Sequence, residues 1–143
     1  MAKRKKATVA QEVEKAAKLL QRYVRLKASD DNGYCTCVTC GKVDHYKAMQ
    51  GGHFIPRGRT RLKLLIENVH PQCPYCNQWG MAQAHYVLRY REWMVDYYGE
   101  RRVKAMEKLA WRTAPKFDRQ EVIEFQRELK EKIKEEEYRI GEY

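Results

Sequence analysis

The 143-residue chain has no long hydrophobic segment, and this absence excludes a helical membrane protein. No apolar run approaches the roughly 18 residues that a membrane-spanning helix needs. A secretory signal is also missing, because the basic start at residues 1–6 is not followed by an apolar stretch. We therefore expect a cytoplasmic protein without a transmembrane segment.

Acidic residues are scarce relative to basic ones. The chain has 19 Asp and Glu against 29 Lys and Arg, which gives a formal net charge of +10. Such an excess favours a polyanionic partner. Nucleic acid is the first candidate and an anionic membrane surface the second, while a charge that only keeps the protein soluble is the alternative without a partner.

Internal repeats and low-complexity linkers are absent, so the length favours one domain with helical extensions. Apolar residues recur at helical spacing over 8–27, 82–98, 100–111 and 118–138. Asp118 with Glu121 has the spacing of a capping box at the start of the last of these helices. We therefore divide the chain into a basic disordered tail (1–7), an N-terminal helix (8–33), a compact metal-binding module (34–98) and a C-terminal helical extension (99–143).

Five cysteines lie in a chain without secretory context, and an odd number argues against a pure disulfide framework. Four of them form two C-x2-C pairs that bracket residues 41–72, and together they predict a structural, four-thiolate zinc site: Cys37, Cys40, Cys73 and Cys76. Cys35 stays outside this set, since C-x-C spacing with Cys37 is a poorer chelate. Five unrelated buried thiols are the alternative.

A histidine between the two cysteine pairs, His53, has the setting expected of a general base. A neutral imidazole is the side chain best matched to accepting a proton near pH 7. Asn68 precedes the second pair and Asn77 follows it directly. This order resembles HNH endonucleases, in which a histidine ends one strand of a hairpin, an asparagine lies in its loop, and a histidine or asparagine opens the following helix.

Each residue type has a use in phosphodiester hydrolysis. His53 would activate water, and Asn68 would order the loop and orient His53. Asn77 would bind Mg²⁺ or Mn²⁺, which can stabilise the scissile phosphate and the leaving oxygen. His85 could be a further metal ligand, about two turns beyond Asn77 if the helix is continuous. A basic run suited to DNA phosphates follows His53, at Arg57, Arg59, Arg61 and Lys63.

Taken singly, these residues also have plainer explanations. His53 could be a loop histidine and Asn68 a turn residue, while Asn77 could be only a helix cap. His85 could be a surface or packing histidine, and the alternating basic residues could form a solvated strand face. The combination favours the nuclease interpretation, because the histidine and both asparagines keep a fixed order around the cysteine pairs.

The order Cys-x2-Cys-Gly, Gly-His-Phe and Glu-Asn-Val-His-x-Gln-Cys-x2-Cys-Asn-Gln resembles the phage lambda NinG (Rap) recombination protein family, over roughly residues 20–130. The resemblance implies an endodeoxyribonuclease that cuts branched DNA, such as Holliday junctions or D-loops, during phage recombination. It would act in the cytoplasm of the infected bacterial host, with phage or host recombination proteins as partners. The predicted fold is α+β and mainly helical, with a zinc-stapled ββα-metal (HNH) module flanked by amphipathic helices.

One position departs from the pattern. The zinc-then-Asn order is also similar to phage T4 endonuclease VII, and in that relative and many HNH enzymes an Asp before the histidine binds the metal. Gly52 occupies that position here. Asn77 alone would be a poor anchor, so His85, a water or a backbone oxygen would have to complete the metal shell.

Two other functions remain open at this point. A zinc-ribbon DNA-binding protein without catalysis explains the charge and both cysteine pairs, but not His53 with Asn77. An HNH enzyme that reads a DNA sequence is less favoured, because no separate recognition module is visible. The helices at 8–27 and 118–138 could hold a homodimer, or could equally cover the core of their own chain.

Overall fold

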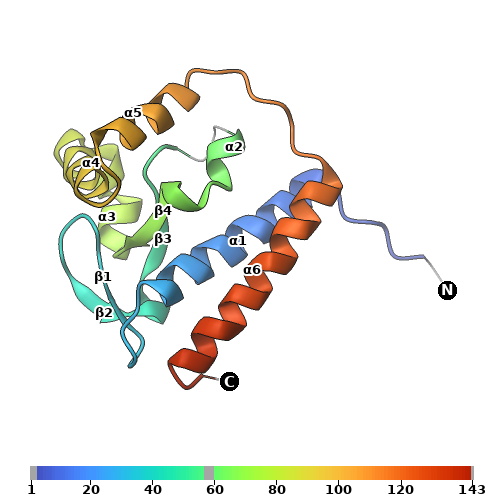
Figure 1. Cartoon of the computed structure of the whole chain (residues 1–143), viewed down its shortest axis with the longest axis horizontal. Coiled ribbons are helices and arrows are strands. Elements are labelled where there is room, and N and C mark those ends of the chain that lie inside the picture. Colours follow the sequence, from blue (N-terminus) through green and yellow to red (C-terminus); the bar gives the residue numbers. More distant parts are fainter. Residues whose placement is uncertain (1–2, 57–59, 143) are drawn as a thin grey trace.

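The computed structural model describes residues 3–56 and 60–142 and confirms an α+β, mainly helical fold. Two short hairpins lie between a pair of long helices on one side and two further helices on the other (Figure 1). The elements, in chain order, are α1 (Val9–Lys27), β1 (Tyr34–Thr36), β2 (Val43–His45), β3 (Gln50–His53), α2 (Thr60–Lys63), β4 (Val69–Gln72), α3 (Pro74–Gln78), α4 (Ala84–Tyr98), α5 (Glu100–Leu109) and α6 (Arg119–Arg139).

The long helices begin at side chains that satisfy their first free N–H groups. Thr8 caps α1, and its hydroxyl accepts from the N–H of Gln11 while the Gln11 side chain accepts from the N–H of Thr8. Asp118 and Glu121 form the predicted capping box at the start of α6. The sequence prediction therefore placed both starts within a residue.

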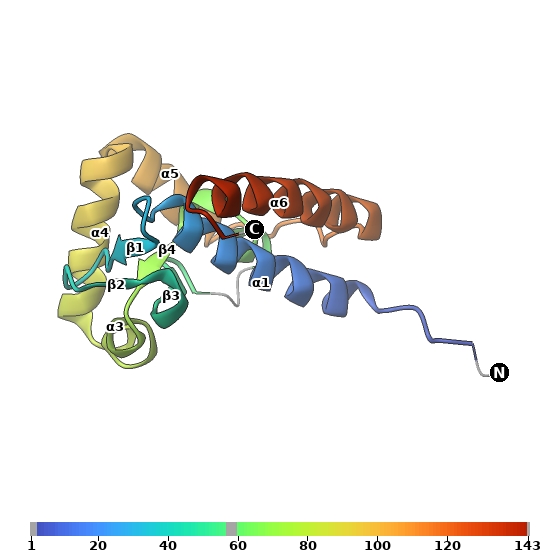
Figure 2. The same ribbon diagram turned by 90° about the horizontal axis from the view of Figure 1, so that it is seen from below.

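Helices α1 and α6 lie side by side and run in the same direction (Figures 1 and 2). Arg119 at the start of α6 bonds to the carbonyl of Ala7, and Arg139 at its end bonds to the carbonyl of Leu26. Between these ends, Gln126 donates to Glu12 at 2.8 Å. The apolar stripes of α1 and α6 therefore pack against each other within one chain. The homodimer considered from the sequence stays a prediction.

The second hairpin supports the residues of interest. Strands β3 and β4 pair antiparallel, with Gly52 opposite His70 and His53 opposite Val69. Helix α3 follows β4 immediately, which completes a strand–strand–helix unit. Because neighbouring residues of a strand point to opposite faces, His53 and His70 lie on different faces of this hairpin. Gly51 lies on the same face as His53 and packs against Gln21 of α1. Helix α1 therefore covers this face of the hairpin.

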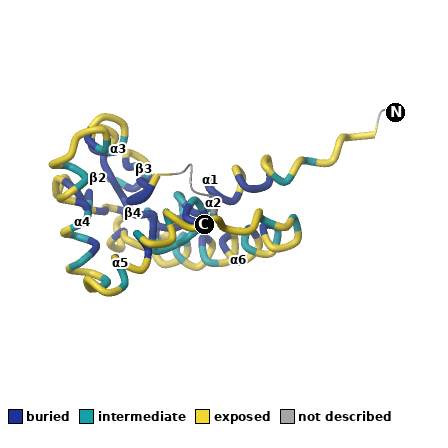
Figure 3. The backbone as a smooth tube through the Cα atoms, turned by 90° about the horizontal axis from the view of Figure 1, so that it is seen from above, coloured by how far each residue is buried: buried dark blue, intermediate teal, exposed yellow. Residues whose placement is uncertain are grey.

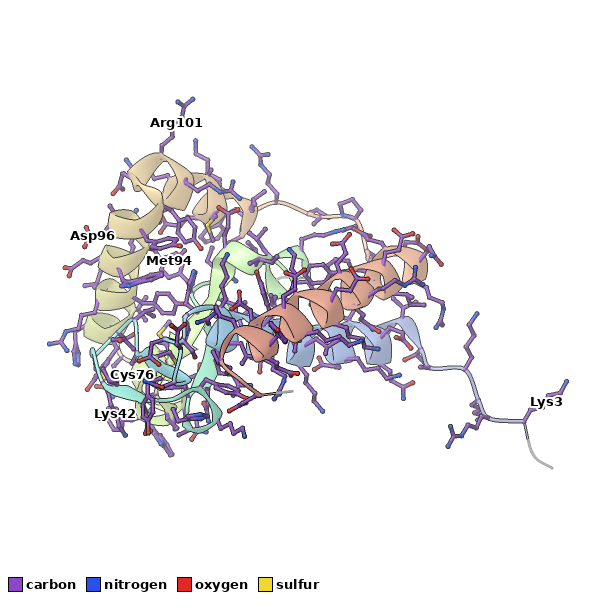
Figure 4. The ribbon with its side chains drawn as sticks, turned by 60° about the horizontal axis from the view of Figure 1, so that its bottom comes forward. Lys3, Lys42, Cys76, Met94, Asp96 and Arg101 are labelled. Atoms are coloured by element: carbon purple, nitrogen blue, oxygen red, sulfur yellow. The ribbon has the colours of Figure 1, made fainter. Side chains whose placement is uncertain are left out.

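Buried residues, dark blue in Figure 3, form three clusters, and two of them lie around this hairpin. One group joins α1 and α6 to the cysteine-rich loops and includes Leu20, Val69 and Leu129. The other joins α4 and α5 to the end of β3 and includes Tyr90 and Met94. Figure 4 shows Met94 directed from α4 into the molecule, whereas the labelled arginine of α5 extends outward. No helix within the described residues is long and apolar enough to cross a membrane.

The helix after the second cysteine pair is not continuous, which changes the setting of two predicted residues. Helix α3 ends at Gln78, a short 3-10 turn follows at Gly80–Ala82, and α4 starts only at Ala84. Asn77 therefore lies near the end of a short helix rather than at its opening. His85 lies in the first turn of a separate helix, so the two-turn spacing expected for a continuous helix does not apply.

Candidate functional site

The four predicted cysteines come together in one cluster. Their sulfur atoms all lie within 4.8 Å of one another, and three of the four residues are buried. Tetrahedral zinc with Zn–S bonds of about 2.3 Å separates its sulfurs by about 3.8 Å. The Sγ atoms of Cys40 and Cys73 are 3.8 Å apart. The donor set and its spacing thus fit a zinc ion, and four thiolates would leave no open position for substrate.

Local backbone geometry prepares both cysteine pairs. Gly41 has a φ of +81°, and its N–H donates to the carbonyl of Cys37 at 3.0 Å, which turns the chain tightly after the first pair. Cys73 caps α3, and its sulfur accepts from the N–H of Cys76 at 3.5 Å. Burial, followed by the neighbouring thiols, raises the pKa of the Cys76 thiol. A bound cation would relieve this crowding of sulfurs.

Cys35 takes no part in the cluster. It lies on β1, is 2% exposed and packs in the main core. Burial raises the pKa of its thiol. These features indicate a core residue rather than a zinc ligand or an exposed reactive thiol.

His53 ends β3, and a hydrogen bond from Nε2 orients its ring. The side chain is 9% exposed, and Nε2 lies 3.0 Å from the carbonyl oxygen of Lys63. A carbonyl can only accept, so the neutral ring carries its proton on Nε2. Nδ1 is then the nitrogen with the lone pair, which is the atom that a general base uses.

His53 and Asn77 lie in the wall of the same cleft, which has a volume of about 510 Å³. Asn77 belongs to α3, and its Nδ2 donates to Oε1 of Gln50 at 2.8 Å. This bond fixes the amide plane and leaves the Asn77 carbonyl oxygen as the atom that can bind a cation. The cleft is formed by α1, β3, α3 and α4 and by the segments beside them; its lining residues are Gln21, Arg25, Met49, Gln50, Gly51, His53, Phe54, Pro56, Asn77, Met81 and Val87.

Asn68 orders the loop that follows β3. It is fully buried; its Nδ2 donates to the carbonyls of Ile55 and Leu62, and its Oδ1 accepts from the N–H of Ile55. Both ends of this loop are thereby joined to one side chain. The described hydrogen bonds of Asn68 go to backbone atoms, so it acts on His53 through the loop that includes Lys63 rather than by a direct bond.

The glycine before His53 has a steric explanation. A Cβ atom at Gly52 would lie 1.7 Å from Oε1 of Gln72, a side chain that is fully buried. Gln72 in turn donates to Thr39, between the cysteines of the first pair. An Asp at position 52 would therefore displace the residue that joins the hairpin to the cysteine cluster.

Arg25 is a residue of the cleft that the sequence interpretation missed. Its Nη1 donates to the carbonyls of Tyr46 and Met49, and its Nε donates to the carbonyl of Gln21. No carboxylate among the described residues pairs with it. Burial, and then the charge of Arg22, lower its pKa. Only the fold brings this half-buried cation beside His53, so no local motif could have revealed it.

The cleft offers few ligands for a catalytic cation. Its described lining contains no Asp or Glu, so the amide oxygen of Asn77 is its best hard oxygen donor. His85 is exposed, packs against the Tyr86 ring and is not among the lining residues. The donor set fits a cation only if DNA phosphate oxygens and water supply most of the coordination.

The predicted phosphate-binding residues are dispersed. Arg57 and Arg59 lie outside the described residues. Arg61 bonds to Glu121 and to the carbonyls of Pro115 and Lys116, and Lys63 pairs with Glu14. Positions 60–63 form a short helix, so the alternating residues do not share a strand face.

A second histidine, His70, supports the opposite face of the hairpin. Tyr90 donates its hydroxyl proton to the carbonyl of Gly52 at 2.8 Å and therefore accepts from Nδ1 of His70. The Tyr98 hydroxyl donates to Nε2 of His70 at 2.8 Å. Burial lowers the pKa of His70 to about 3. The ring is thus neutral, and its network holds the backbone next to His53.

Comparison with known proteins places the chain in one family. The family model described as Bacteriophage Lambda NinG protein matches residues 1–138. Searches of curated proteins and of solved structures gave no match. Because the family model covers nearly the whole chain, including both cysteine pairs and the cleft, this protein belongs to the bacteriophage lambda NinG family.

Proposed function

We propose that this protein is a metal-dependent HNH endonuclease that hydrolyses phosphodiesters in branched DNA. One observation supports the proposal most directly. His53 ends the first strand of a strand–strand–helix unit, its Nε2 donates to a carbonyl, and its ring shares a cleft with Asn77 of the helix. That combination gives a proton acceptor and an oxygen ligand in one open cavity.

His53 is the general base in this proposal. Its Nδ1 takes a proton from the attacking water, while the carbonyl of Lys63 holds the ring and stabilises the imidazolium that forms. Asn68 keeps that carbonyl in place by joining the two ends of the loop. Proton transfer to a positioned side chain contributes about 100- to 10,000-fold to the rate.

Arg25 binds the phosphate next to the scissile bond. Its Nε and Nη1 are held by carbonyls, and no described residue takes a hydrogen bond from Nη2. A guanidinium without a carboxylate partner inside a cleft is suited to an anionic ligand. The predicted products are a 5′-phosphate and a 3′-hydroxyl.

Asn77, with Gln50 fixing its amide, would hold Mg²⁺ or Mn²⁺ together with the DNA. The bound cation would supply charge neutralisation for the scissile phosphate and the leaving 3′-oxygen. The structural zinc has a separate role, since its four sulfur ligands leave no position for substrate.

Branched DNA is the proposed substrate because the NinG family is associated with phage recombination. The chain is strongly basic, as a protein that binds a phosphate backbone should be. Arg57 and Arg59 remain proposed phosphate contacts, whereas Arg61 and Lys63 would first have to leave their acidic partners.

A zinc-containing DNA-binding protein without catalysis is the second candidate. The absence of Asp and Glu from the described lining of the cleft favours it, because most Mg²⁺ sites contain a carboxylate. This alternative leaves the orientation of His53 and the charge of Arg25 in the cleft without a use.

The two candidates are separated by cleavage of a labelled four-way junction and of a linear duplex of matched sequence. We expect wild type to cut the junction with Mg²⁺ or Mn²⁺ and not to cut it when these metals are withheld, with the duplex cut more slowly. Binding of both DNAs without cleavage under any of these metals would favour the non-catalytic protein. Equal cutting of both DNAs would retain the nuclease and remove the preference for branches.

A further inference from the structure

A second cleft, with a volume of about 460 Å³, lies beside β4 at the ends of α1 and α4. It shares no lining residue with the His53 cleft among the described residues. Aromatic rings from β4 and α4 form much of its wall: His70, Trp93, Tyr97 and Tyr98. Neither the zinc site nor the proposed hydrolysis uses these rings as a binding surface.

The rings present flat surfaces at fixed positions. Trp93 and Tyr97 are stacked with an interplanar angle of 9° and centroids 5.0 Å apart. The His70 ring lies 4.6 Å from Trp93 and is held by hydrogen bonds from both sides. Tyr97 is 64% exposed, although it is a large aromatic residue. The stack therefore ends in a ring that is open to another planar group.

The charge around the cleft indicates which kind of ligand would stack on these rings. Lys27 is the one Lys or Arg among the described lining residues, and it is exposed; no Asp or Glu lines the cleft, although Cys37 of the cysteine cluster does. It forms no ion pair with a described carboxylate, although its ammonium lies 5.9 Å from the centre of the Tyr23 ring. An apolar peptide would use the rings and leave this charge unused. A nucleotide uses both, because its base stacks and its phosphate attracts a lysine.

We propose that this cleft binds the base of an unpaired nucleotide, stacked on the Trp93–Tyr97 pair with its phosphate near Lys27. The inference deepens the proposed function and rests on it, because it takes DNA as the ligand. Bases inside a duplex are already stacked and cannot enter a wall of rings. The cleft would therefore favour DNA with unpaired nucleotides, such as a branch point, over an intact duplex.

The cleft is separate from the chemistry but connected to it. His70 forms part of the aromatic wall, and its bond to Tyr90 continues to the carbonyl of Gly52, the residue before His53. Because His70 and His53 lie on opposite faces of the hairpin, the stacked base belongs to a nucleotide other than the one being cut.

The test measures DNA binding by wild type and Tyr97→Ala without added Mg²⁺ or Mn²⁺, a condition in which no cleavage is expected and the zinc is retained. The probes are a fluorescein-labelled single-stranded 12-mer and the duplex of the same sequence. We expect Tyr97→Ala to weaken single-strand binding about tenfold, within the range for loss of one base–aromatic stack, and to change duplex binding less than twofold. Tyr97→Phe should restore the wild-type affinity, since it keeps the ring.

Trp111→Ala is the matched control, because Trp111 is also aromatic, is 85% exposed and lies outside the cleft. A single 2-aminopurine in the 12-mer should lose fluorescence on binding wild type and recover most of it with Tyr97→Ala. Equal losses for single strand and duplex, or no loss for Tyr97→Ala, would overturn the inference. Circular dichroism of each variant separates loss of stacking from loss of fold.

The outcome is independent of the nuclease assignment. If wild type never cuts DNA but shows the Tyr97-dependent preference for single strands, the base-binding role of the cleft is supported and the nuclease proposal is wrong. If wild type cuts junctions and Tyr97→Ala binds single strands normally, the nuclease proposal is supported and the base-binding role of the cleft is wrong.

Discussion

The cysteine cluster and the His53 cleft adjoin each other at α3, yet they are built in opposite ways. The cluster takes two cysteines from each of two tight turns and buries three of the four. Its four sulfur atoms would occupy all four coordination positions of a zinc ion. The cleft takes one to three residues from each of several elements and stays open, and its cation, Arg25, has no carboxylate partner among the described residues. A metal site with all its positions filled by protein ligands suits a structural role. An open cavity whose described lining contains an unpaired guanidinium and a free amide oxygen suits the binding of a substrate.

The largest effect should come from breaking the closed site. Cys76→Ser should remove zinc and unfold the module, because structural zinc in small zinc-binding peptides contributes about 10–16 kcal/mol. Metal analysis should find one zinc per wild-type chain and none in the variant, and thermal melting should lose its cooperative transition.

Cys35→Ser is the matched control, since Cys35 is equally buried but outside the cluster. It should keep one zinc and melt cooperatively at a modestly lower temperature. Zinc loss in Cys35→Ser, with zinc retained in Cys76→Ser, would contradict the assignment of the ligands.

A smaller effect is expected in the open site from Arg25. Arg25→Ala should lower junction cleavage about 30- to 100-fold, because a hydrogen bond to a charged group contributes about 1.5–3 kcal/mol and the interaction is strongest on the transition state. Arg25→Lys should recover part of this loss. Single-turnover rates at saturating protein provide the measurement.

Arg22→Ala serves as the comparison, because Arg22 lies one turn earlier on α1 but pairs with Glu137 at 2.9 Å. It should cleave within about threefold of wild type. If both arginine variants lose the same activity, Arg25 contributes only general charge and not a phosphate contact.

The open site should also bind its cation weakly on its own. The described lining offers amide oxygens but no carboxylate, so calorimetry of wild type with Mg²⁺ or Mn²⁺ should give no saturation below about millimolar metal unless DNA is present. Tight binding without DNA would mean that residues outside the described lining supply carboxylates. Asn77→Ala should raise the metal concentration needed for cleavage and leave the zinc content unchanged.

The smallest effect concerns pH. The pKa of His70 is about 3 in the folded protein, against about 6.5 for an unperturbed histidine, so only the unfolded chain takes up this proton between those values. The contribution of His70 is therefore complete above pH 6.5 and is lost as the pH falls toward 3. At pH 5.5 the loss is about 1.4 kcal/mol.

Urea unfolding at pH 7.0 and 5.5 measures this change, and zinc content checked at each pH separates it from metal loss. His70→Gln should reduce the difference between the two pH values. An unchanged difference in the variant would show that His70 is not the group responsible.

Local patterns explain what the sequence could predict. The C-x2-C pairs, the capping box of Asp118 and the apolar spacing of the long helices each depend on residues a few positions apart, and all three agree with the structure. His53 and Asn77 share a cleft because β3, β4 and α3 are close in the sequence and fold into one strand–strand–helix unit, with His53 on β3 and Asn77 on α3.

Long-range contacts explain what the sequence could not predict. Arg25 reaches the cleft only because α1 packs on the β3–β4 hairpin. Glu121 and Glu14, which pair with Arg61 and Lys63, come from α6 and α1. The helix predicted over 82–98 matches α4, which starts at Ala84, but the sequence did not reveal that Asn77 lies near the end of a separate short helix, α3.

The most direct test of the central claim is single-turnover cleavage of a four-way junction by His53→Ala, with His85→Ala as an exposed histidine control on α4. His53→Ala should bind the junction with wild-type affinity, retain its zinc and cut about 100- to 10,000-fold more slowly. His85→Ala should cut like wild type. Wild-type cleavage by His53→Ala would contradict the assignment of His53 as the general base.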